Sequence, residues 1–159
     1  MQFNVAPITP SDKPTVVELI SHWLADFIIS RGRKLYPAEL PGFLARDGSG
    51  EAVGLVTYET IGDQCEVVTL DAFTPWSGIG TALMQAVETA AQSKGCRRIW
   101  LITTNDNVEA VRFYQRRGYT FAAVHVNALE QSRKLKPQIP MVGNFGIPMR
   151  DELEFEKSL

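Results

Sequence analysis

A strand, a glycine-containing turn and an amphipathic helix follow one another between Val67 and Glu88, and this stretch constrains the fold more than any other. Residues 67–73 are mostly apolar and include β-branched side chains, which is typical of a strand. Beyond the turn, apolar residues recur at three- and four-residue intervals, which predicts a helix that buries one face and ends near Gly95. The residues on that face are Ile79, Ala82, Leu83, Ala86, Val87, Ala90 and Ala91.

The turn itself, Gly78-Ile79-Gly80, indicates an anion site. The first N–H groups of a helix have no partner within the helix, and the helix dipole adds partial positive charge there. Glycines let a phosphate approach these N–H groups closely. Two other phosphate motifs are excluded, because no lysine follows Gly80 and because Leu83 stands where a dinucleotide motif has its third glycine. A tight turn without a ligand is the alternative for these glycines.

Composition narrows the class of protein. At 159 residues and 45% hydrophobic, the chain is expected to form one domain over residues 1–159. A net charge of -2 argues against a nucleic-acid partner. No apolar run reaches the ~20 residues of a membrane helix, and no signal peptide is recognisable, so we expect no membrane partner and a cytoplasmic location. Cys65 and Cys96 are expected to be reduced packing residues, and no histidine spacing indicates a metal site.

The rest of the pattern predicts an α+β fold with strands in a meander around the central helix. Alternation of Leu153 and Phe155 with glutamates predicts a half-exposed last strand. Asp106 and Glu109 resemble a capping box at the start of a helix. Strands are expected at residues 2–8, 42–46, 52–59, 66–73, 97–104, 119–126 and 152–156, and further helices after Thr9 or Ser11, after Asp106 and at Ala128. Residues 27–29 fit either a strand or an extra helical turn.

A second pattern makes the combination of sequence features specific enough to compare with a known family. It reads Asn107-x-x-Ala110-x-x-Phe113-Tyr114-x-x-x-Gly118-Tyr119. With the order of elements, it resembles the GCN5-related N-acetyltransferase (GNAT) superfamily, in its small bacterial form, over nearly the whole chain. The family turn Arg/Gln-x-x-Gly-x-Gly/Ala begins here with Pro75, which removes one side-chain contact and one amide. The resemblance implies a mixed, mostly antiparallel twisted sheet of about six to seven strands flanked by helices. Its parallel strands, around residues 66–73 and 97–104, would splay apart.

The family resemblance implies acetyl-CoA as the cofactor. Its pyrophosphate would lie on the backbone amides from Trp76 to Thr81, and its pantetheine would pair like an added strand with the free backbone near residues 70–73. Asn107 would hold the cofactor or cap its helix, and Trp76 would cover the cofactor or pack on the loop. The cofactor residues implied are Leu70, Ala72, Phe73, Trp76, Ser77, Gly78, Ile79, Gly80, Thr81 and Asn107.

The reaction implied is acetyl transfer to a primary amine by direct attack, in a ternary complex and without an acetyl-enzyme. An alkylammonium group with a pKa of ~10.4 is protonated at neutral pH and needs a base. Tyr114 matches the family tyrosine that reaches the sulfur and would be the acid, unless it only packs. Glu66 occupies the position of the glutamate base of histone-acetylating members, and Asp71 is the second candidate. The two carboxylates share a face only if a bulge shifts the strand.

The acceptor is expected to bind between residues 23–36 and 136–149, which vary most within the family. A small-molecule amine is the first expectation. A protein lysine or N-terminus is an alternative within the enzyme class. A non-catalytic acyl-CoA-binding or dimerising module is the alternative outside it, and a homodimer is left open.

Overall fold

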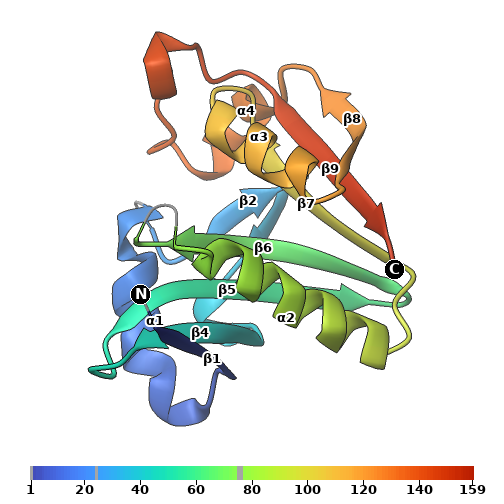
Figure 1. Ribbon diagram of the computed structural model, residues 1–159. Coiled ribbons are helices and arrows are strands. Elements are labelled where there is room, and N and C mark those ends of the chain that lie inside the picture. The colour runs from blue at the N-terminus through green and yellow to red at the C-terminus, as the bar shows by residue number, and fades with distance from the viewer. Residues whose placement is uncertain (1, 24, 75–76) are drawn as a thin grey trace.

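The computed structural model describes residues 2–23, 25–74 and 77–159 of the chain, with the side chain of residue 23 outside that description. Within this part, one seven-stranded sheet runs in the order β1-β4-β5-β6-β7-β9-β8, and a separate hairpin consists of β2 and β3 (Figure 1). The strands are β1 (Phe3–Pro7), β2 (Ile28–Ser30), β3 (Arg33–Leu35), β4 (Gly42–Asp47), β5 (Ala52–Ile61), β6 (Gln64–Ala72), β7 (Arg98–Thr104), β8 (Thr120–His125) and β9 (Glu152–Ser158).

Helices cover both faces of this sheet. The helices are α1 (Lys13–Ile20), α2 (Ile79–Ser93), α3 (Val108–Arg116) and α4 (Ala128–Leu135). In Figure 1, α2 lies across the front of β5 and β6, whereas α1 and the β2–β3 hairpin lie behind the sheet. None of the helices in the described residues is long and apolar enough to cross a membrane.

The parallel strands β6 and β7 separate along their length. They pair only from Gln64 with Arg98 to Val67 with Leu101, although β6 continues to Ala72 and β7 to Thr104. Every other pair of neighbouring strands in the sheet is antiparallel. The mixed, mostly antiparallel α+β architecture and the splayed strands that were expected from the resemblance are therefore confirmed.

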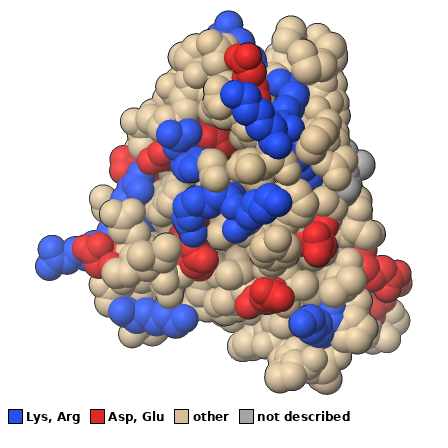
Figure 2. All heavy atoms as spheres, turned by 180° about the vertical axis from the view of Figure 1, so that it is seen from behind, with Lys and Arg blue, Asp and Glu red and all other residues tan. Residues whose placement is uncertain are grey.

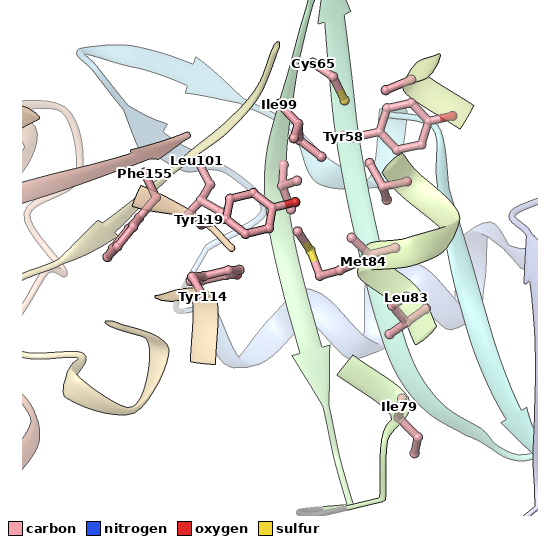
Figure 3. Packing of buried hydrophobic residues seen from close by; sticks show 14 of the residues in the cluster. Tyr58, Cys65, Ile79, Leu83, Met84, Ile99, Leu101, Tyr114, Tyr119 and Phe155 are labelled. Carbon is pink, nitrogen blue, oxygen red and sulfur yellow. The ribbon is translucent and has the colours of Figure 1, made fainter. Parts of the chain in front are cut away.

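The largest core cluster lies between α2 and the sheet and continues across the split (Figure 3). Ile79, Leu83 and Val87 of α2 have no exposed surface, as their spacing predicted. The helix lies directly on β5, because a Cβ added at Gly54 would come within 2.6 Å of Ile79. On the other side of the split the same cluster includes Phe155. Two halves of the sheet thus share one core even where their backbones part.

The start of α3 differs from the predicted capping box. Asn107, not Asp106, caps the helix, since its Oδ1 accepts from the N–H of Ala110 at 3.2 Å. Asp106 is buried instead, where it accepts from the Thr104 hydroxyl at 2.5 Å and from the backbone and side chain of Asn144 at 2.9 and 3.0 Å. The prediction failed because the partner of Asp106 comes from a loop nearly forty residues further along the chain.

The last strand is not a half-exposed one. β9 inserts between β7 and β8, and both Phe155 and Glu152 are buried. The glutamates are compensated on their own face: Glu154 accepts from Arg98 at 2.6 Å and contacts His125 at 2.9 Å. The alternation of apolar and acidic residues correctly predicts that one face of this strand is polar. It does not reveal that ion pairs cover this polar face.

Candidate active site

A cleft of about 730 Å³ opens where β6 and β7 part, on the side of the sheet that carries α2. The end of β6, the first turn of α2 and one face of α3 form its walls. The described residues that line it are Leu70, Ala72, Thr74, Ser77, Gly78, Ile79, Gly80, Thr81, Glu109, Ala110, Arg112, Phe113, Tyr114, Arg116 and Arg117.

The first turn of α2 offers backbone donors to this cleft. Gly78 is the N-cap in the left-handed conformation, with φ of 82°, which glycine adopts without steric cost. The first bond within the helix runs from the N–H of Ala82 to the Gly78 carbonyl at 3.0 Å. The N–H groups of Ile79, Gly80 and Thr81 therefore have no partner within the helix and suit an anion.

The end of β6 offers a free strand edge to the same cleft. Phe73 donates its N–H to the Val53 carbonyl of β5 at 2.9 Å. Alternate residues of a strand direct their backbone groups to opposite neighbours, so the N–H and C=O groups of Leu70 and Ala72 face the side that β7 has left. An extended ligand with amide groups could add to this edge as another strand does.

Tyr114 brings a hydroxyl group to the cleft. Its side chain is only 8% exposed, and its ring packs between those of Phe113, Tyr119 and Phe155 at centroid distances of 5.1 to 6.0 Å. In the described residues its hydroxyl makes no hydrogen bond. Every fully buried side-chain oxygen there does have a hydrogen-bond partner, so this hydroxyl is not fully buried and reaches the cleft surface. Burial, with a smaller contribution from the charge of Asp71, raises the pKa of Tyr114. The group therefore keeps its proton at neutral pH and can only donate it.

A bulge in β6 places the two candidate carboxylates on one face. The β5–β6 register shifts between Thr57 and Tyr58, so that Val68 of β6 has no opposite residue. Glu66 consequently contacts the β2–β3 hairpin, and Asp71 contacts His22, which follows α1. The hairpin and α1 both lie behind the sheet, so both carboxylates are on its rear face, whereas Leu70 faces the cleft. The bulge that would bring Glu66 and Asp71 to the same side is thus present.

Glu66 is buried beneath the hairpin, with 3% of its surface exposed. It accepts from the Ser30 hydroxyl at 2.5 Å and from the Arg33 guanidinium at 3.4 Å. Burial raises the pKa of Glu66, although both partners favour its ionised form. Asp71 lies 3.3 Å from Nε2 of His22, an imidazole whose Nδ1 is 2.5 Å from the Leu19 carbonyl. Both carboxylates are therefore held in place by polar neighbours.

The β2–β3 hairpin spans the split in the sheet. Its turn residue Arg31 holds Glu152 of β9 through its guanidinium at 2.8 Å and its N–H at 3.2 Å. Arg33 of the same hairpin binds Glu66 of β6 and Glu59 of β5. Figure 2 shows this rear face, where basic and acidic side chains lie interleaved. The two halves of the sheet are thus connected by ion pairs where their backbone pairing ends.

Residues 12–119 match the family model described as the acetyltransferase (GNAT) family. The chain belongs to the GNAT family. This GNAT protein has two relatives in Bacillus subtilis strain 168, YxbD and YdhI, and both are described as uncharacterized proteins. YxbD is 40% identical over 98% of this chain and 99% of its own length. YdhI is 55% identical over 75% of this chain and 74% of its own length.

Solved structures agree on the fold. A GNAT family acetyltransferase from Elizabethkingia anophelis with acetyl-CoA bound superposes with a TM-score of 0.71 at 17% identity, over 99% of this chain and 98% of that one. At such low identity the likeness concerns the fold of this GNAT protein and not its substrate.

The cleft brings together most of the residues that the sequence singled out. It contains eight of them: Leu70, Ala72, Ser77, Gly78, Ile79, Gly80, Thr81 and Tyr114. Phe73 does not line it and is 44% exposed, and the side chain of Asn107 caps α3. Glu66 and Asp71 lie on the rear face. Pro75 and Trp76 fall outside the described residues.

Sequence reasoning missed three arginines of this GNAT protein that line the cleft, Arg112, Arg116 and Arg117. A signal for them exists. Arg116 and Arg117 follow Phe113 by three and four residues, and Arg112 precedes Arg116 by four, so the helical repeat brings them close together at the end of α3. The family pattern contains Asn107, Phe113 and Tyr114 and none of these arginines.

Proposed function

We propose that this GNAT protein is an N-acetyltransferase that moves an acetyl group from acetyl-CoA to a primary amine of a small molecule. The amine attacks directly, without an acetyl-enzyme. The observation that carries the proposal is the cleft itself. It joins the free N–H groups of the α2 turn, the open edge of β6 and the hydroxyl of Tyr114 in one cavity.

The residues present fit the cofactor. The N–H groups of Ile79, Gly80 and Thr81 would hold the pyrophosphate, with Ser77 and Gly78 at the same turn. The backbone of Leu70 and Ala72 would pair with the amide groups of pantetheine. When bound, acetyl-CoA supplies the acetyl group in activated form, as a thioester. The solved GNAT structure with acetyl-CoA bound supports this assignment.

Side chains of this protein would carry out two proton transfers. Tyr114 would give its proton to the departing sulfur, because its raised pKa keeps it protonated. Glu66 would accept the proton of the amine, because burial raises its affinity for a proton, and Asp71 on the same face is the second candidate. A backbone N–H of residues 70–72 would stabilise the developing negative charge on the carbonyl oxygen. The parted strands would connect the rear face, where the amine enters, with the cofactor cleft.

The function can be tested with the purified protein. Calorimetry should detect binding of acetyl-CoA, and thiol release should follow when small primary amines are added. Peptides with a free lysine or N-terminus are the comparison set. Faster release with peptides than with any small amine would favour the protein-acetylating alternative. Binding without thiol release for every acceptor would favour the non-catalytic module.

The identity of the base gives a separate prediction. Burial raises the pKa of Glu66, so a wild-type enzyme that uses it should lose kcat/KM as the pH falls, beginning above the ordinary glutamate value of ~4.3. Glu66→Gln should lower kcat/KM about 100-fold and remove that limb of the pH profile. Asp71→Asn is the matched comparison and should keep the limb. If Asp71→Asn removes it and Glu66→Gln does not, the roles are reversed.

A further inference from the structure

One wall of the cleft carries a concentration of positive charge that the acetyl-transfer chemistry does not use. Arg112 and Arg116 of α3, together with Arg117 at its C-cap, line the cleft beside Phe113. In residues 2–23, 25–74 and 77–159, neither Arg116 nor Arg117 forms an ion pair with a carboxylate. Glu109 lines the same wall, three residues before Arg112. A chain with a net charge of -2 thus places several cations around one cavity.

Arg117 is already fixed beside the α2 turn. Its Nε and Nη2 donate to the hydroxyl of Thr81 at 2.8 and 2.6 Å, and its Nη1 donates to the Phe113 carbonyl at 2.9 Å. Its guanidinium also lies 3.6 Å from the centre of the Phe113 ring. Burial and the neighbouring charge of Arg116 lower the pKa of Arg117, which shows that the positive groups oppose one another. An anion bound between them would relieve that repulsion.

The anionic groups of CoA exceed what the α2 turn can hold. CoA carries a pyrophosphate and, on its ribose, a separate 3′-phosphate. The N–H groups of the turn, with Arg117 next to Thr81, suit the pyrophosphate. Two further guanidinium groups on the same wall match one additional phosphate, since arginine binds phosphate oxygens through paired N–H donors.

We propose that Arg112 and Arg116 bind the 3′-phosphate of CoA, so that the enzyme distinguishes CoA from 3′-dephospho-CoA. This inference rests on the proposed function. It assigns cofactor specificity to side chains of α3, separate from the backbone groups that hold the pyrophosphate.

The test compares two ligands that differ by this single phosphate. Calorimetry with CoA and with 3′-dephospho-CoA should give the wild-type protein a preference for CoA of about tenfold or more. The double variant Arg112→Gln/Arg116→Gln should bind CoA more weakly but 3′-dephospho-CoA as before, so that the preference disappears. Unchanged binding of 3′-dephospho-CoA also shows that the variant is folded. Lys94→Gln/Arg97→Gln removes the same charge just beyond the far end of α2 and should keep the preference.

Two results would overturn the inference while leaving the proposed function intact. One is equal affinity of the wild-type protein for the two ligands. The other is a double variant that loses the same factor for both ligands, because the arginines would then serve the pyrophosphate or only the general field of the cleft. Failure of the wild-type protein to bind either ligand would instead overturn the proposed function, and this inference with it.

Discussion

Replacing Tyr114 with phenylalanine is expected to lower kcat about 100-fold. The change removes only the hydroxyl that we propose as proton donor to the departing sulfur, and this hydroxyl has no hydrogen-bond partner among the described residues. The Kd for acetyl-CoA and the free energy of unfolding should therefore stay close to their wild-type values. Thiol release under saturating acetyl-CoA measures the first quantity, and calorimetry and urea denaturation measure the others.

Tyr119→Phe is the matched control for this variant. Tyr119 is also buried and packs against Tyr114, but its hydroxyl donates to Glu88 at 2.8 Å. Loss of that bond should reduce the free energy of unfolding by about 1 kcal/mol and leave kcat unchanged. Because the pKa of Tyr114 is raised, the wild-type enzyme should lose no activity through its ionisation between about pH 6 and 9. A Tyr114→Phe enzyme that keeps wild-type turnover across that interval has no need of the hydroxyl as an acid.

Replacing Phe155 with alanine is expected to reduce the free energy of unfolding by about 3–5 kcal/mol. Phe155 has no exposed surface, and its ring lies 4.4 Å from that of Phe121 and 6.0 Å from that of Tyr114. Its strand, β9, pairs with both β7 and β8, so the cavity would form at the centre of the half-sheet beyond the split. Urea denaturation measures the change.

Phe145→Ala provides the comparison for stability. Phe145 is 72% exposed, and its truncation should change the free energy of unfolding by no more than about 0.5 kcal/mol. A loss of similar size in both variants would show that the aromatic cluster around Phe155 does not hold β8 and β9 in place.

Local patterns predicted the parts of this fold that depend on local physics. The helix after Gly78 follows from the spacing of apolar residues, and the anion-binding turn follows from backbone donors that any helix of this kind exposes. The position of β9 did not follow, because insertion between β7 and β8 depends on which strands meet after a long connection. The assignment of residues 27–29 stayed open for the same reason, since β2 is a three-residue strand that pairs with β3 and is held by the distant carboxylate of Glu66.

One part of the candidate site could likewise be predicted from local sequence, and the other part could not. Its cofactor side consists mainly of backbone groups and small residues, which a motif over a short stretch can encode. Its rear side depends on contacts between Ser30 and Glu66, 36 positions apart, and between Arg31 and Glu152, 121 positions apart. No local pattern carries such information, so the sequence named Glu66 without revealing that a hairpin covers it.

The hairpin that bridges the parted strands allows the rear face of the sheet to change in sequence independently of the cleft beside α2. Beyond Val67 and Leu101 backbone pairing no longer joins the half-sheets, and the arginine side chains of the β2–β3 hairpin, outside the main sheet, connect them there. Substitutions in that segment can change the width or charge of the proposed amine entrance without disturbing the α2 amides proposed to bind the cofactor. Descendants of one ancestral gene could thus diversify in what they modify while keeping the same donor.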